Sequence, residues 1–157
     1  MTVDTKPDVT FADNVTKFVV AAGVLILVLA AFGIGFGALR AREANAATNE
    51  WLSQVRSEDY AQAHARLAED RRRQIDPDRF RSVVSSNATL RGYRQFRREA
   101  VETDSGTLVV KGRIVSDAGE QAVEFRWVRQ SGPEGRRLML DNLVFAGSSA
   151  LFTEEAP

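Results

Sequence analysis

The feature that most constrains this chain of 157 residues is an uncharged apolar run close to its N-terminus. From Phe18 to Leu39 the sequence reads FVVAAGVLILVLAAFGIGFGAL, without a charged or strongly polar side chain. About 20 such residues are enough for a helix to cross a hydrocarbon core of roughly 30 Å. We therefore predict one transmembrane helix over residues 18–39, preceded by a short polar tail over residues 1–17.

Glycines lie on alternate positions at the end of this run, which raises the question of a phosphate-binding loop. Such a loop needs a preceding strand, a following helix N-terminus and usually a lysine, whereas these glycines lie inside an uncharged span. Gly33 and Gly37 are spaced i, i+4, with Ala30 about one turn earlier, and together they form a flat face for a second helix. The pattern predicts a homodimer through the membrane helix; the alternative is that glycine is simply common in such helices.

A cleaved signal peptide is the competing interpretation of the apolar run. The stretch from Ala44 to Ala47 offers an Ala-x-Ala step, but signal peptides have apolar regions of about 7–15 residues after a basic segment. This run is longer and follows a tail with three aspartates, so we predict an uncleaved anchor. Basic residues flank the two ends almost equally, and the charge rule decides little about orientation. We place the C-terminal domain outside the cytoplasm, mainly from the family resemblance described below.

Composition excludes several classes of function. Lys plus Arg and Asp plus Glu are equal at 21 each, so overall charge does not favour nucleic acid as a partner. The chain has no cysteine, which excludes thiol catalysis, thiolate metal ligands and disulfides. One histidine and scattered carboxylates make no recognisable metal-binding set, and we predict neither a metal nor a cofactor.

After the anchor, the sequence predicts a linker over residues 40–47, an α+β domain over residues 48–146 and a flexible tail over residues 147–157. Apolar residues from Trp51 to Leu67, with Ala61 and His64 among them, recur at intervals of three and four and predict helix. Ser57 is the expected N-cap at which this helix breaks and restarts. A further short helix is expected to begin at Pro77, with Asp76 as its N-cap.

From Gly92 onward the apolar period changes from helical to alternating. The segments YRQFRREAVE, TLVVKGRIVS, QAVEFRWVRQ and RLMLDNLVFA, joined by turn-rich links, predict a meander of four antiparallel strands. Glu124 is expected near Lys111 or Arg113 in a ladder of opposite charges on the outer face. The predicted fold class is therefore α+β, with helices packed on a curved four-stranded antiparallel sheet.

The segment WLSQVRSEDYAQAHARLAEDRRRQIDPDRFRSVV carries a family resemblance. Its Trp-Leu pair, the short acidic link to Tyr60 and Ala61, and the arginine-rich end before Asp-Pro-Asp-Arg-Phe resemble the opening of small nuclear-transport-factor-2-like (cystatin-like) domains. The resemblance extends over about residues 48–146. Several bacterial members of that family are anchored to the membrane by a single helix or by a lipid. The chain also resembles the cytochrome oxidase assembly factor 1 and Tim21-like group, which pairs a single span with a small α+β domain.

The first resemblance also implies candidate catalytic residues. Its ketosteroid-isomerase-like and polyketide-cyclase-like branches use acids, Tyr or His in an apolar pocket as general acid and base. His64, Tyr60 and Asp141 are the residues here that match this requirement. The structural alternatives are packing roles for His64 and Tyr60, and a bulge or a bond to a neighbouring arginine for Asp141 or Asn142.

Arginine is concentrated between Arg66 and Arg98, where ten arginines occur with four acids. Such a patch can hold anionic lipid headgroups near the anchor or dock an acidic partner, or it can be solvated charge whose stems cover apolar surface. The predicted docking residues are Arg71, Arg72, Arg73, Arg94, Arg97 and Arg98. We expect a single-pass, non-enzymatic binding or assembly module that engages another membrane or envelope protein. The alternative is an isomerase- or cyclase-like enzyme with a small apolar pocket.

Overall fold

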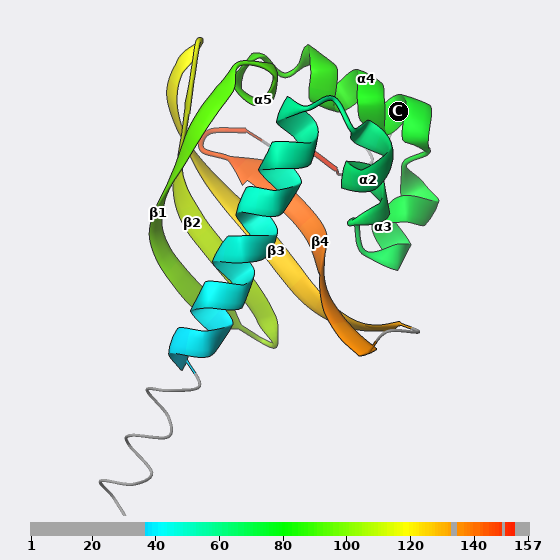
Figure 1. Ribbon diagram of the computed structural model, residues 1–157, viewed down its shortest axis with the longest axis vertical. Helices are drawn as coiled ribbons and strands as arrows, with labels where there is room; N and C mark the ends of the chain where they lie inside the picture. Colours follow the sequence, from blue (N-terminus) through cyan, green and yellow to red (C-terminus); the bar gives the residue numbers. More distant parts are fainter. Residues whose placement is uncertain (1–36, 133–134, 149, 153–157) are drawn as a thin grey trace, which may run out of the picture. The chain divides into compact units, whose positions relative to one another are not determined.

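The computed structural model describes residues 37–132, 135–148 and 150–152 (Figure 1). The chain divides into two compact units, Met1–Arg40 and Ala41–Pro157, and the second unit contains the fold described here. The predicted transmembrane helix and its packing residues lie outside the described residues, except for positions 37–39. Within the described ranges, no helix combines the length and the apolar composition that a membrane crossing requires.

The second unit has the predicted α+β fold, in which helices pack on a four-stranded antiparallel sheet of order β1-β2-β3-β4 (Figure 1). In this unit a long helix over residues 41–56 is followed by four short helices: α2 (Tyr60–Ala65), α3 (Glu69–Gln74), α4 (Pro77–Ser86) and α5 (Ala88–Arg91). The strands are β1 (Tyr93–Asp104), β2 (Thr107–Ser116), β3 (Gly119–Gly132) and β4 (Gly135–Phe145).

The break after the long helix occurs where it was predicted, but its capping residue is different. Asp59, not Ser57, is the N-cap of α2, and its Oδ1 accepts a hydrogen bond of 3.1 Å from the Gln62 N–H. Ser57 instead donates its hydroxyl back to the carbonyl oxygen of Ser53, at 3.0 Å. Ala63 is the buried alanine of α2, while Ala61 is exposed.

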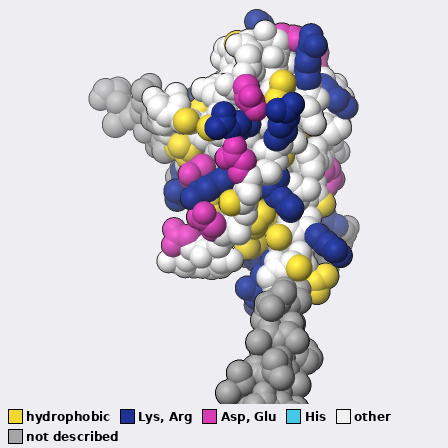
Figure 2. Space-filling view, turned by 90° about the vertical axis from the view of Figure 1, so that its left-hand side faces the viewer, with side chains coloured by type: hydrophobic (Ala, Val, Ile, Leu, Met, Phe, Trp, Pro, Cys, Tyr) yellow, Lys and Arg dark blue, Asp and Glu magenta, His cyan; other side chains and the backbone are white. Residues whose placement is uncertain are grey.

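The strand faces follow the predicted alternation. The described inner face of β2 and β3 consists of the buried residues Leu108, Val110, Gly112, Ile114, Val123, Phe125 and Trp127. On the outer face Lys111 is paired with Glu124 across the middle hairpin, and its Nζ lies 2.8 Å from Glu102 Oε2. Figure 2 shows the resulting mixture of basic and acidic side chains on the side of the molecule where β1 lies.

Aromatic side chains fill the space between the helices and the sheet. The Trp127 indole Nε1 donates to the Thr48 hydroxyl at 3.0 Å, and that hydroxyl donates to the Ala44 carbonyl at 2.9 Å. Phe152 is stacked on Phe80 with 5.7 Å between ring centroids, and only 3% of it is exposed. Residues 151 and 152 of the predicted flexible tail therefore pack on the core, whereas Gly147 and Ser148 are exposed.

Candidate functional site

The three candidate catalytic residues make structural contacts. The Nε2 of His64 donates to the Ile75 carbonyl oxygen at 2.8 Å, and the imidazole meets the Phe80 ring edge-on, with 5.3 Å between centroids. The guanidinium of Arg81 lies over the half-buried Tyr60 ring, 5.6 Å from its centroid. These contacts correspond to the packing roles that were the alternative for both residues.

Asp141 is the extra residue of a β-bulge in β4. Arg126 of β3 pairs with Asn142, whereas the next residue, Trp127, pairs with Leu140, so Asp141 has no opposite partner. Asn142 is turned inward and is 7% exposed, and Asp141 accepts hydrogen bonds from Arg71. Both structural alternatives for this position, a bulge and a bond to an arginine, therefore hold.

The six predicted docking arginines are divided between two edges of the sheet. Those of α3 lie beside β4, because the Arg71 side chain is bonded to Asp141. Arg94, Arg97 and Arg98 are on β1, the strand at the opposite edge, where Arg94 pairs with Asp117 and Arg97 lies 3.7 Å from Glu120. The structure thus offers two separate basic regions instead of one patch.

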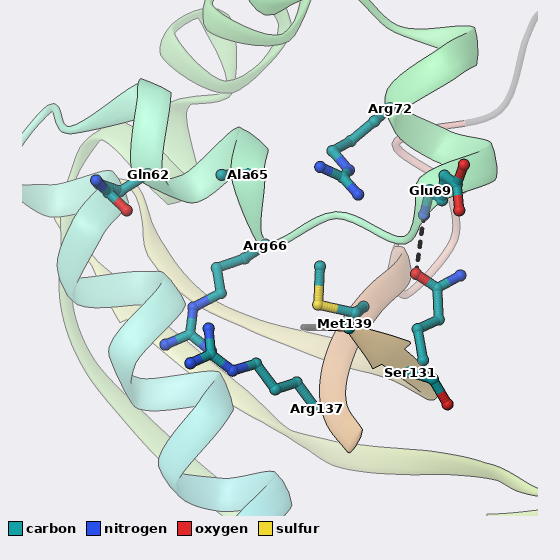
Figure 3. A pocket seen from close by; sticks show the side chains of 10 residues that line it. Gln62, Ala65, Arg66, Glu69, Arg72, Ser131, Arg137 and Met139 are labelled. Carbon is teal, nitrogen blue, oxygen red and sulfur yellow. Dashed lines mark hydrogen bonds between the residues drawn. The ribbon is translucent and has the colours of Figure 1, made fainter. Parts of the chain in front are cut away.

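A surface groove lies where α2 and α3 meet the end of the β3–β4 hairpin (Figure 3). Its volume is about 470 Å³. We call it the arginine groove, because three of its lining side chains are arginines. The lining residues are Gln62, Ala65, Arg66, Glu69, Arg72, Gln130, Ser131, Gly132, Arg137 and Met139.

Backbone hydrogen bonds hold the walls of the arginine groove together. The link between α2 and α3 runs parallel to β4, with a bridge between Leu67 and Leu140. The Leu140 N–H donates to the Arg66 carbonyl at 2.8 Å, and the Ala68 N–H donates to the Leu140 carbonyl at 2.8 Å. These bonds fix the start of α3 against β4, so the groove is a built feature of the fold.

A side-chain hydrogen bond also joins α3 to β3 at this groove. The Glu69 N–H of α3 donates to Gln130 Oε1 of β3 at 3.1 Å, as the dashed line in Figure 3 shows. The helical and hairpin sides of the groove are therefore tied by both a short strand pairing and a side-chain bond. Neither this groove nor a second one on the outer face of the sheet is lined by His64, Tyr60 or Asp141.

The charges of the arginine groove are unbalanced. Glu69, the one acid among its described lining residues, forms an ion pair with Arg73, and Arg66 forms one with Glu50 of the long helix. Arg72 is exposed and makes no ion pair among the described residues. Among the described lining residues, three are arginines and one is a glutamate. Guanidinium groups bind carboxylates and phosphates through paired N–H donors, so the groove is suited to an anion.

The sequence pattern identified Arg72 as a docking residue but did not select Arg66 or Arg137. Arg66 was counted in the arginine-rich segment without being placed at a site. Alternation along β4 puts Arg137 and Met139 on the face opposite the buried Leu138 and Leu140, and this was the available signal for Arg137.

No protein-family model matches this chain, and a search of the curated proteins also finds no match. The two family resemblances therefore remain predictions.

Proposed function

We propose that this protein is a single-pass, membrane-anchored binding or assembly module without enzymatic activity. In this proposal its nuclear-transport-factor-2-like domain engages another membrane or envelope protein through the arginine groove. The observation that supports it is an open groove with an excess of positive charge, whose walls are tied to the sheet by backbone bonds. The six arginines predicted from the sequence then have different roles, and Arg72 is the one that faces a binding site.

The isomerase- or cyclase-like enzyme is less well supported. Acid–base chemistry requires an ionisable group in an apolar cavity with room for a substrate. The Nε2 of His64 is instead bonded to Ile75, and the neighbouring space is filled by Phe80 and Phe152. We therefore base the proposal on binding.

The proposed anchor and orientation can be tested with single cysteines, since the chain has none of its own. Thr5→Cys lies before the apolar run, and Ala118→Cys lies at the exposed turn between β2 and β3. A membrane-impermeant thiol reagent added to intact cells should label the second variant and not the first. Labelling of the first alone would reverse the orientation, and labelling of both in intact cells would contradict a single span.

The binding role can be tested by photo-crosslinking in intact cells. A photoreactive residue at Gln62, in the groove, should give a discrete adduct with a membrane or envelope protein. The matched control is the same residue at Thr103, an exposed position on β1 at the other edge of the sheet. Equal adducts from both positions, or none from Gln62, would contradict docking in the groove.

A further inference from the structure

We infer that the arginine groove recognises an extended acidic segment of a protein, in which two carboxylates flank one apolar side chain on the same face. This inference rests on the proposed function and adds the chemistry of the partner. It follows from three observations: the order of chemical groups along the groove, its uncharged polar residues, and a carboxylate of the chain itself that already forms an ion pair with one of the arginines.

The cationic groups of the groove are separated by an apolar one. In the view of Figure 3 the guanidinium groups of Arg66 and Arg137 lie to one side of Met139, and that of Arg72 lies to another. Met139 is half-buried, so its thioether offers an apolar contact between the charges. A ligand that uses all three features carries an anion, an apolar group and a second anion in that order.

An extended peptide can present this order. Successive side chains of a strand point to opposite sides, so residues i, i+2 and i+4 share one face. The recognised segment is therefore acidic at i and i+4 and apolar at i+2. Gln62 and Ser131 are exposed, uncharged and polar, and they provide hydrogen-bonding groups for the main chain of such a segment. A phosphate headgroup also accepts hydrogen bonds, but it has no main chain of regularly spaced N–H and C=O groups to bond with Gln62 and Ser131.

Glu50 of the long helix provides a carboxylate that already pairs with one arginine of the groove. Its carboxylate is paired with Arg66, and the two side chains are 51% and 30% exposed. Exposed ion pairs contribute little to stability, so an incoming carboxylate can replace Glu50 at small cost. The internal carboxylate is thus a competitor, and its removal should strengthen binding while the removal of an arginine weakens it. A purely structural role of these residues does not produce opposite effects of this kind.

The test uses the full chain in nanodiscs of phosphatidylcholine and a fluorescent peptide with the order Glu-Ser-Leu-Ser-Glu, measured by anisotropy. Wild-type protein should bind this peptide and not its Gln-Ser-Leu-Ser-Gln counterpart. Arg72→Gln should weaken binding about tenfold, because one of the flanking cations is lost. Arg72 makes no ion pair among the described residues, so this variant keeps its fold, and Glu50→Gln should bind several-fold more tightly.

The control is the triple variant Arg94→Gln, Arg97→Gln and Arg98→Gln on β1, which removes more positive charge than Arg72→Gln and should still bind like the wild type. Equal weakening by this variant and by Arg72→Gln would overturn the inference, since binding would then follow overall charge. Binding of phosphatidylserine vesicles, abolished by Arg72→Gln, without peptide binding would also overturn it in favour of a lipid.

Different results would contradict the acidic-segment inference and the proposed function. A protein partner crosslinked from Gln62 that the acidic peptide does not displace would overturn the inference and leave the proposed function in place. Peptide binding at the groove without any crosslinked partner in cells would contradict the proposed function and leave the chemistry of the groove intact.

Discussion

Arg71 of α3 is bonded to Asp141 in the bulge of β4, with its Nε 3.0 Å from the backbone oxygen and 3.3 Å from Oδ1. The same guanidinium donates to Gln74 Oε1 at 2.9 Å and to the Phe152 carbonyl oxygen at 3.5 Å. One side chain therefore connects a helix, a strand and the C-terminal segment. The role of Arg71 is therefore structural, although its two neighbours in sequence, Asp70 and Arg72, are exposed.

We expect Arg71→Ala to lower the free energy of unfolding by about 2 kcal/mol, because hydrogen bonds of a partly buried charged group to several partners are lost. Arg73→Ala is the matched control, since its i, i+4 pair with Glu69 is exposed and should contribute less than about 0.5 kcal/mol. Urea denaturation of both variants measures the difference. Equal losses would show that Arg71 has no special structural role.

Local patterns predicted most of the fold but misplaced one helix boundary. Alternation identified the buried faces of β2 and β3, because side chains of a strand alternate strictly and one face packs on the helices. Ser57 and Asp59 are both good capping residues, and local preference does not decide between them. Glu58, which lies between them, adopts a φ of 58°, a conformation that is uncommon for a residue other than glycine and that the local pattern did not predict.

The position of Gly112 also depends on tertiary structure. Alternation placed it on the buried face, but gave no reason for a glycine there. A Cβ at this position would lie 2.4 Å from the Arg97 carbonyl oxygen and 2.7 Å from the Phe96 ring, so β1 passes too closely for any side chain. Only the packed structure shows this contact.

The candidate site was less accessible to sequence analysis than the fold. Arg66 and Arg137 are far apart in the chain and line one groove because Leu67 bridges to Leu140. A single parallel bridge between a helix–helix link and the last strand leaves no periodic signal in the sequence. The density of arginines was a correct observation, but the sequence did not show that they lie at two edges of the sheet.

The cap of α4 gives a prediction of pH dependence. Asp76 Oδ1 accepts hydrogen bonds from the N–H groups of Arg79, at 2.9 Å, and Asp78, at 3.0 Å. These bonds, that of Arg79 foremost, hold the pKa of Asp76 below its ordinary value of 3.8. Because the folded pKa is lower than the unfolded one, this stabilisation is present above the unfolded pKa and is lost as the pH falls through the folded pKa.

We expect Asp76→Ala to lower the melting temperature at neutral pH, with the gap to wild type narrowing as the pH falls well below 3.8. Asp76→Asn should retain much of the cap, because the amide oxygen accepts the same hydrogen bonds. The difference in melting temperature between Asp76→Asn and Asp76→Ala should therefore not change with the titration of Asp76. Thermal melts across acidic pH provide the measurement. A gap between wild type and Asp76→Ala that stays constant with pH would contradict the assigned cause.

The C-terminal segment is expected to contribute to the core. Phe152 stacks on Phe80 and meets Trp51 edge-on with 6.4 Å between centroids, and the Leu151 N–H donates to the Leu143 carbonyl at 2.7 Å. Phe152→Ala should lower the free energy of unfolding by about 3 kcal/mol through loss of buried area and the cavity left behind.

Two further variants make this prediction specific. Phe152→Leu should cost less than Phe152→Ala, because it retains most of the apolar volume, and Ser148→Ala, at an exposed position, should be nearly neutral. Denaturant unfolding followed by the fluorescence of the two buried tryptophans, Trp51 and Trp127, measures these differences. Stability equal to wild type for Phe152→Ala would mean that residues 150–152 do not pack into the core in solution.

In the proposed function the arginine groove, and not positive charge in general, engages the partner protein. The most direct measurement is the yield of the Gln62 photo-crosslinked adduct in cells that express one of two charge-matched variants at equal levels. We expect Arg66→Gln, Arg72→Gln and Arg137→Gln together to abolish the adduct, and Arg94→Gln, Arg97→Gln and Arg98→Gln together to leave it unchanged. An adduct that survives the groove substitutions, or that falls equally with both sets, would mean that the groove does not engage the partner.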